Sequence, residues 1–420
     1  MTQAARAASV RRPDCRLCAS LKLEAAFSLK PTPVADHYLK PDEAGRDEPR
    51  YPLDLALCAD CGHLQLRDAV DPEILFGSYT FVTSASLGLI EAFRQGAKRL
   101  LAVAEPAPGA LAVDIGSNDG SQLRFFKEAG LRVLGVDPAR AIAARATAAG
   151  IETWPEYFTA ELGRRIRSAL GEAAIVTANN VFAHADDLGG MADGVREILA
   201  PGGVFSFEVS YLADTLRGML FDTIYHEHVC YHSVEPLRSF FDRHGLQLFD
   251  VERIGAKGGS IRGLVQRKGG PRPESPAVGE MVALEERLGL RDLATWHRFA
   301  ERIDQAKERL LEAVDLLRSQ GKHLAGYGAS VTVTTLLHHF ELGSRLDFLV
   351  DDNPVKQGTL SPGYHLPVLP SRALYERKPD RTLILAWKYA DPILSRHAAY
   401  LKAGGGFLIP LPELRTVTAG

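Results

Sequence analysis

Residues 110–120 read ALAVDIGSNDG, and this stretch decides the predicted fold. The apolar run at 110–115 predicts a buried strand, and the glycine-bearing turn after it opens a predicted helix at 122–129. Farther along, strands are predicted at 131–136, 174–178 and 204–209, with an alanine-rich helix at 139–149. This alternation predicts an α/β fold with a parallel sheet and helices on both of its faces.

The turn at 114–120 predicts a particular kind of ligand. Gly116 and Gly120 have no Cβ, so the backbone can approach a bound group closely. The turn is not the dinucleotide fingerprint G-x-G-x-x-G, because Asn118 stands where that pattern needs a glycine. Its carboxylates, Asp114 and Asp119, would repel a pyrophosphate but suit a ligand with a cationic end, such as S-adenosylmethionine.

A further carboxylate supports the same cofactor. Asp137 ends the next predicted strand, where an acid can accept both ribose hydroxyls of a nucleoside. The turn, the acid and the alternating pattern together predict an S-adenosylmethionine site, with an ordinary α/β turn as the alternative.

Four of the five cysteines form two C-x2-C pairs, Cys15 with Cys18 and Cys58 with Cys61. Two such pairs are the ligand set of a closed, structural zinc site with four thiolates, and free or redox-active thiols are the alternative. Residues 19–57 would then form an inserted loop or a small sheet. We expect zinc to hold the fold rather than to take part in chemistry.

The most informative polar stretch reads YHEH at 225–228 and follows the strand at 204–209. His184 follows the preceding strand, and Gly258-Gly-Ser260 joins two strands predicted to be antiparallel, so three segments should meet at one edge of the sheet. A histidine is the simplest base near neutral pH, and a carboxylate such as Glu227 can tune it. The i, i+2 spacing of the two histidines differs from the H-E-x-x-H metal motif.

The alternative for this cluster is a set of polar side chains satisfied within a loop. For Cys230 and His232, just after the cluster, we expect structural roles, and for His63 local packing.

The remaining sequence predicts a further α/β unit. A Gly/Pro-rich linker at 269–276 precedes a long amphipathic helix at 293–319, and strands and helices alternate again from 323 to 410. We therefore expect three domains, at 1–70, 71–272 and 273–420.

Composition excludes several classes of protein. The chain has 420 residues, of which 46% are hydrophobic and 24% charged, and its net charge is −3. A nucleic-acid footprint needs clustered Lys and Arg, so we expect no nucleic-acid partner. No apolar run reaches the roughly 20 residues of a membrane span, and residues 1–13 hold three arginines and no apolar segment, unlike a secretory signal. We expect a cytoplasmic protein.

The chain resembles the S-adenosylmethionine-dependent C-methyltransferases of nucleotide-linked 4-keto deoxysugars. The resemblance spans essentially the whole chain and rests on five motifs: CADCGH at 58–63, DIGSNDG at 114–120, YHEH at 225–228, GYGA at 326–329, and VDDNP at 350–354 with Lys356 after it. It implies a zinc-binding N-terminal domain, a class I methyltransferase core and a Rossmann-like C-terminal domain that positions the nucleotide.

The resemblance also implies roles for single residues. His228 resembles the family's base, with Tyr225, Glu227 and His184 around the sugar. Cofactor contacts are expected from Tyr79, Asn180, Asp137 and the turn at 114–120. The expected reaction is removal of a proton beside the ketone by His228, enolate stabilisation by Tyr225 or His184, and methylation at carbon by a monomeric enzyme.

This chain departs from the family pattern at two places. Ser330–Thr335 replaces the usual lysine–glycine–asparagine, and Lys257 stands where a histidine is common. The sugar or its carrier is therefore expected to differ from the family norm. The alternatives are an O-methyltransferase, an inactive nucleotide-sugar-binding protein, a nucleic-acid methyltransferase with a zinc module, and an NAD-dependent enzyme using the turn at 326–328.

Overall fold

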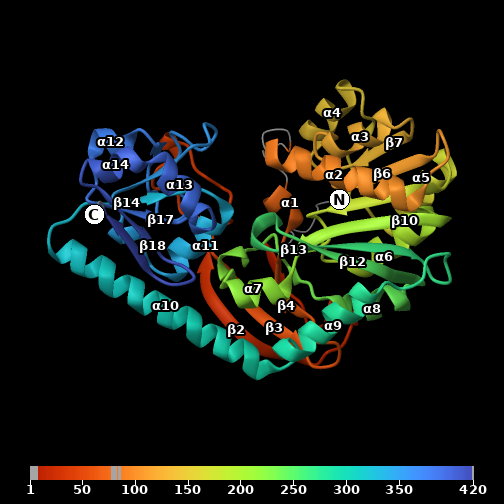
Figure 1. Cartoon of the computed structure of the whole chain (residues 1–420), viewed down its shortest axis with the longest axis horizontal. Helices are drawn as coiled ribbons and strands as arrows, with labels where there is room; N and C mark the ends of the chain where they lie inside the picture. Colours follow the sequence, from red (N-terminus) through yellow and green to blue (C-terminus); the bar gives the residue numbers. More distant parts are fainter. Residues whose placement is uncertain (1–7, 77–82, 84–86, 419–420) are drawn as a thin grey trace, which may run out of the picture.

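The structure, a computed structural model, describes residues 8–76, 83 and 87–418. Two lobes stand side by side, and the strands β2 (Leu23–Thr32), β3 (Tyr51–Cys58) and β4 (Leu64–Leu66) lie below and between them (Figure 1). None of the helices among these residues is long and apolar enough to cross a membrane.

The first lobe is built on a seven-stranded sheet in the order β12-β13-β10-β9-β6-β7-β8. Five strands are parallel: β6 (Leu111–Ile115), β7 (Arg132–Val136), β8 (Thr153–Trp154), β9 (Ala173–Asn179) and β10 (Leu199–Ser210). The edge hairpin, β12 (Leu246–Ile254) and β13 (Ser260–Arg267), is antiparallel because its connection is too short for a crossover. The predicted strands and their directions are confirmed.

Helices cover both faces of this sheet. On one face, α2 (Leu87–Ala104) and α3 (Ser121–Glu128) bury Leu100 and Phe126 against the sheet. On the other face lie α5 (Ala160–Leu170), α6 (Leu188–Ile198) and α8 (Val234–Arg243), while α4 (Arg140–Ala148) follows β7 and packs against β8. The predicted α/β core, with helices on both faces of a mainly parallel sheet, is confirmed.

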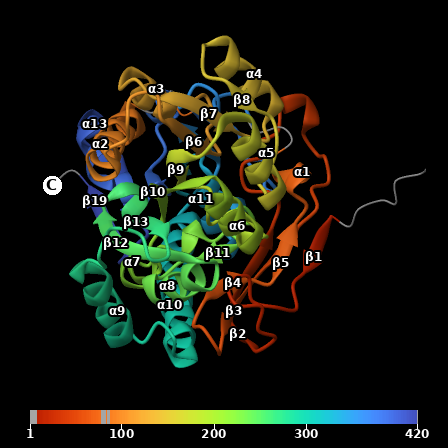
Figure 2. The same cartoon turned by 90° about the vertical axis from the view of Figure 1, so that its right-hand side faces the viewer.

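The N-terminal strands form a small antiparallel sheet in the order β11-β4-β3-β2. Its edge strand β11 (Cys230–Tyr231) comes from the first lobe, directly after the YHEH stretch. A separate ribbon pairs β1 (Ser9–Arg11) with β5 (Asp68–Val70), and α1 (Pro72–Phe76) follows it. Figure 2 shows these red and orange strands along one flank of the molecule. Residues 19–57 thus form the small sheet that was one of the two predicted outcomes.

After the predicted linker, α9 (Pro276–Leu288) packs against α8 and β12 of the first lobe, and the 27-residue helix α10 (Leu293–Ser319) runs from there to the second lobe (Figure 1). Its six-stranded sheet runs in the order β16-β15-β14-β17-β18-β19 and is parallel except for the last pair. The strands are β14 (Leu324–Tyr327), β15 (Phe348–Asp351), β16 (Val368–Pro370), β17 (Arg381–Ile384), β18 (Gly406–Ile409) and β19 (Arg415–Thr418). The helices are α11 (Val331–His339), α12 (Ala373–Arg377), α13 (Ala390–Arg396) and α14 (Ala398–Lys402).

One predicted helix is divided. The sequence predicts a helix near 392–401, whereas α13 ends at Arg396 and α14 begins at Ala398. The buried imidazole of His397 between them hydrogen-bonds Tyr327 Oη (3.1 Å) and Tyr375 Oη (3.0 Å). These two tertiary bonds account for the position of the break.

Candidate active site

The turn after β6 requires glycine at two positions. Gly116 has φ +68°, and a Cβ there would lie 2.2 Å from Val181 Cγ2. Gly120 has φ +73°, and its Cβ would lie 2.8 Å from Ile151 Cγ2. Other residues rarely adopt this backbone region, and neither site has room for a side chain. The glycines therefore let the turn fold back over the ends of β6 and β7.

Three buried carboxylates surround this turn. Asp114 accepts a hydrogen bond from Thr177 Oγ1 (2.6 Å), and burial raises its pKa to about 7. Asp137 accepts the backbone N–H groups of Asn118 (2.8 Å) and Ala139 (2.9 Å), and burial raises its pKa as well. Asp119 accepts the N–H of the next helix at Ser121 (3.1 Å). A ligand with a sulfonium, an ammonium and ribose hydroxyls fits this acidic set.

Of the three other expected cofactor contacts, Asn118 and Asn180 lie within the described residues. Asn118 has φ +49°, and its side-chain oxygen accepts the backbone N–H of Thr83 (3.0 Å). Asn180 follows β9 at the same sheet edge with φ +57°, and its N–H donates to the Glu208 carbonyl (2.8 Å). Tyr79 lies outside the described residues.

His228 is held in a defined orientation. Its Nδ1 lies 2.8 Å from the Thr223 carbonyl oxygen, and its Nε2 lies 2.9 Å from Tyr225 Oη. A carbonyl only accepts, so Nδ1 carries a proton, and in the neutral imidazole Nε2 is the acceptor of the Tyr225 hydroxyl proton. The geometry thus places Nε2, the basic nitrogen of a neutral imidazole with this tautomer, against a phenol.

The predicted partners of His228 lie close to it. The His184 ring centre is 5.0 Å from that of His228, and the Phe76 ring stacks on His184 with 6.0 Å between ring centres. Glu227 is buried next to His228 in the chain. The Gly258–Ser260 segment also reaches this region, because a Cβ on Gly258 would lie 3.2 Å from Leu220 Cδ1, just before the turn that leads to His228.

The other histidines of the stretch point elsewhere. His226 Nε2 donates to the Tyr51 carbonyl (3.1 Å), and burial lowers the pKa of His226 to about 4. His232 is buried against the His63 ring, 5.5 Å between ring centres, and Cys230 is buried in β11. These positions agree with the structural roles predicted for His63, Cys230 and His232.

The sequence reasoning missed two groups in the turn that precedes His228. The Thr223 carbonyl selects the tautomer of His228, and the Asp222 carboxylate is buried beside it. A backbone carbonyl leaves no signature in a sequence. Asp222 was visible in the same stretch, but its partners come from a part of the chain more than 160 residues away.

The four paired cysteines converge. Their Sγ atoms all lie within 4.8 Å of one another, with Cys15–Cys61 at 3.6 Å and Cys18–Cys58 at 3.5 Å. Four thiolates about 2.3 Å from a common centre are the coordination set of structural zinc. The four-stranded sheet, in which β3 ends at Cys58, is joined to the YHEH stretch, because the Leu66 N–H donates to the Val229 carbonyl (3.0 Å) directly after His228.

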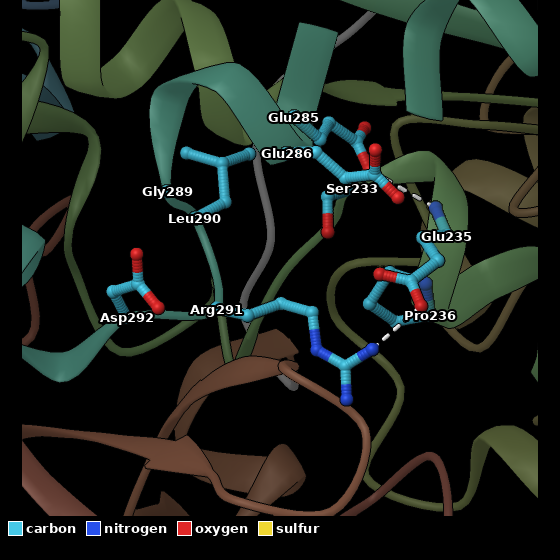
Figure 3. A pocket seen from close by; sticks show the side chains of 9 residues that line it. All are labelled: Ser233, Glu235, Pro236, Glu285, Glu286, Gly289, Leu290, Arg291 and Asp292. Carbon is cyan, nitrogen blue, oxygen red and sulfur yellow. Dashed lines mark hydrogen bonds and ion pairs between the residues drawn. The ribbon is translucent and has the colours of Figure 1, made fainter. Parts of the chain in front are cut away.

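A surface pocket lies by the start of α8 (Figure 3). Its Glu285 carboxylate accepts the N–H groups of Val234 (2.6 Å) and Glu235 (3.0 Å), and Arg291 pairs with Glu235 (2.6 Å). Glu285 thereby caps α8, with a pKa that burial raises to about 7. Its polar groups serve the fold rather than a ligand.

Comparison with known families finds three consecutive matches. Residues 15–76 match a family described as "Putative zinc binding domain", residues 89–251 match a methyltransferase domain, and residues 255–412 match a C-methyltransferase C-terminal domain. The first match begins at the first cysteine of the metal cluster, and the second contains the cofactor turn and the YHEH stretch.

Individual proteins match as well. The C-methyltransferase NovU of Streptomyces niveus is 36% identical over 407 residues, 97% of this chain and 97% of that protein. Among solved structures, the magnesium protoporphyrin IX methyltransferase of Synechocystis with bound S-adenosylhomocysteine covers 43% of this chain and 84% of its own, at 16% identity and a TM-score of 0.35. The CcbJ methyltransferase of Streptomyces caelestis covers 46% of this chain and 95% of its own, at 15% identity and a TM-score of 0.34.

Proposed function

The chain belongs to the C-methyltransferase family, and from that premise we propose that it methylates a carbon atom beside the ketone of a nucleotide-linked 4-keto sugar. The observation that carries this proposal is the pairing of His228 Nε2 with Tyr225 Oη at 2.9 Å, with Nδ1 anchored on a carbonyl. A base and a hydroxyl donor side by side are what removal of a proton next to a carbonyl needs.

The residues around the first turn suit S-adenosylmethionine. Asp114, Asp119 and Asn118 would face its cationic end, and Asp137 its ribose hydroxyls. When bound, this cofactor supplies a methyl group that is electrophilic because it is attached to a sulfonium. His228, His184 and the cofactor turn follow strands that end at the same sheet edge, which supports a common site.

The geometry suggests how Tyr225 and His228 divide the work. Nε2 has a single lone pair, and the Tyr225 hydroxyl occupies it. A ketone oxygen that accepts the Tyr225 hydroxyl proton in a hydrogen bond leaves that lone pair open. His228 then takes the α-proton, the C–H electrons become the enolate double bond, and the negative charge forms on the oxygen that Tyr225 contacts. Glu227 and His184 would support the imidazolium and the sugar.

The three parts of the chain would have separate tasks. We assign zinc binding to residues 1–70, the cofactor to 71–272 and positioning of the sugar nucleotide to 273–420. Positioning is a substantial contribution to rate, since it replaces a bimolecular encounter by a held geometry. The replaced stretch Ser330–Thr335, which in the structure is the N-cap and first part of α11 rather than a loop, supports a carrier or sugar that differs from the family norm. We also propose that the enzyme acts as a monomer.

The test separates proton removal from methyl transfer. The wild-type enzyme in heavy water, without cofactor, should exchange the α-proton of a thymidine-diphosphate 4-keto-deoxysugar, and His228→Ala should lose this exchange. His323→Ala, at an exposed histidine of the other lobe, is the control and should keep it. Exchange at the wild-type rate in folded, zinc-loaded His228→Ala would exclude His228 as the base, and a methyl group found on oxygen would contradict C-methylation.

A further inference from the structure

Asp222 is a buried carboxylate whose partners lie in the other lobe. Its side chain is 1% exposed, in the short turn Phe221–Thr223. Trp387 Nε1 donates to one oxygen (3.0 Å), and Lys388 Nζ lies 3.2 and 3.3 Å from the two oxygens. A buried charge is costly unless it is paired and hydrogen-bonded, so these partners are needed for the carboxylate to stay at this place.

The residues on both sides of Asp222 are held by the same lobe. The Phe221 ring stacks on Phe340 with 5.2 Å between ring centres, and the Ile224 carbonyl accepts Thr335 Oγ1 (2.8 Å). Between them lies Thr223, whose carbonyl oxygen binds His228 Nδ1. The Thr223 carbonyl, which fixes the tautomer of His228, therefore lies in a turn that the C-terminal lobe contacts at Phe221, Asp222 and Ile224.

The stem of Lys388 reaches the third converging segment as well. A Cβ on Gly258 would lie 3.4 Å from Lys388 Cδ, so this side chain passes along the Gly258–Ser260 connection on its way to Asp222. Its ammonium group pairs with the Asp222 carboxylate. This favours an ion pair between the lobes over a contact to a substrate phosphate.

We propose that Asp222 is a positioning residue for methyl transfer. Through Trp387 and Lys388, Asp222 connects the C-terminal lobe to the turn that contains Thr223, and the Thr223 carbonyl leaves His228 Nε2 as the proton acceptor. This inference rests on the proposed role of His228 as the base. It assigns the C-terminal lobe a task beyond holding the nucleotide. The turn Phe221–Thr223 holds His228 in its reactive orientation only when that lobe is docked on it.

The primary variant is Asp222→Asn, which keeps the shape and can still accept from Trp387 but loses the charge that pairs with Lys388. We expect kcat to fall on the order of 10- to 100-fold while KM for both substrates stays within about twofold, because the turn shifts without a lost substrate contact. The pH profile of kcat should also move. Two titratable groups that face the His228 ring among the described residues, Tyr225 and His184, remain in place in this variant.

Three further variants sharpen the test. Lys388→Met should reproduce the loss in kcat, and Lys388→Arg should restore most of it. Trp387→Phe removes a single N–H donor and gives a readout if Asp222→Asn does not fold. The control is Asp380→Asn, which neutralises a carboxylate of the same lobe that pairs with Lys322 (2.9 Å), and it should keep the wild-type kcat.

The outcomes separate the two claims. A rise in KM for the sugar nucleotide alone, with kcat and pH profile unchanged, would make Lys388 a substrate contact and overturn the positioning role. Wild-type kinetics in Asp222→Asn would overturn it too. If His228→Ala keeps α-proton exchange, the proposed base is wrong whatever Asp222 does. If His228→Ala loses exchange while the Asp222 variants behave as wild type, only the positioning role falls.

Discussion

Gly116 is the residue with the least room for change in the cofactor turn. An alanine there would have to keep φ near +68° and place its Cβ 2.2 Å from Val181 Cγ2. The backbone strain alone costs roughly 1–2 kcal/mol, and the clash adds to it. We expect Gly116→Ala to weaken binding of S-adenosylmethionine, measured by calorimetric titration, and to lower the thermal midpoint.

Two matched variants separate strain from clash. Gly109 has a similar φ of +74° with no atom within 4 Å of its would-be Cβ, so Gly109→Ala should cost about 1 kcal/mol of stability and leave cofactor binding intact. Val181→Ala removes the clashing methyl group and should recover part of the binding in the Gly116→Ala background. Equal effects at both glycines would show that the close approach does not matter.

At the scale of single residues, the sequence predicts what side-chain chemistry makes visible. Cys15, Cys18, Cys58 and Cys61 were recognisable by spacing, and their thiols do converge. The tautomer of His228 was not predictable, because it depends on the backbone oxygen of Thr223. A main-chain carbonyl is the same in every residue, and only the folded turn gives it a direction.

Among the elements, the four-stranded sheet connects the four-cysteine cluster to the YHEH stretch at 225–228. β3 ends at Cys58, β4 follows the second cysteine pair, and β11 joins this sheet immediately after His228 and Val229. Loss of the metal should therefore reach the active site through strand pairing rather than through chemistry at the ion.

We expect Cys58→Ser to lose the bound zinc, to lower stability by about 3 kcal/mol or more and to reduce methyl transfer strongly. Metal content by mass spectrometry, thermal unfolding and activity should change together, and a strong chelator should reproduce the effect in the wild type. Cys230→Ala is the control: it removes a buried thiol from the same sheet, outside the four-cysteine cluster, and should keep one zinc per chain. Full activity in metal-free protein would contradict the coupling.

The sequence predicts elements well where one pattern is sustained. The strands β6, β7, β9 and β10 are apolar runs buried on both faces, and each was predicted. The strand β2 was not predicted as such, since its residues mix buried and exposed positions without regular alternation and its pairing with β3 contains bulges. The two-residue strand β11 exists only because β4 lies beside it.

Across the whole molecule, the N-terminal sheet is the part that both lobes share. On one side β2 packs on α10, where Phe27 meets Phe299 with 5.7 Å between ring centres. It also meets α11, where the backbone N–H of Lys30 donates to His339 Nδ1 (3.2 Å). On the other side the same sheet ends in β11 of the first lobe. Docking of the second lobe thus depends on a contact that is sensitive to protonation.

His339 should make this docking weaken in acid. To accept the Lys30 N–H, Nδ1 must be unprotonated, and burial together with the charges of Lys307 and Lys30 lowers the pKa of His339 to about 4, while Glu341 acts in the opposite direction. Its unfolded pKa is near 6.5, so between pH 6.5 and 4 the unfolded chain binds more protons than the folded one. The stability that His339 contributes is complete above about pH 6.5 and is lost as pH falls through about 4.

We expect denaturant unfolding to show a free energy that falls between pH 6.5 and 4, with about 1–3 kcal/mol of the fall due to His339. His339→Asn keeps an acceptor for Lys30 and cannot be protonated, so it should reduce the slope over this range, while other buried histidines such as His226 still contribute. His323→Asn, at a side chain that is 76% exposed, should leave the slope unchanged. A slope in His339→Asn equal to that of the wild type would mean that protonation of α11 does not govern how the second lobe docks.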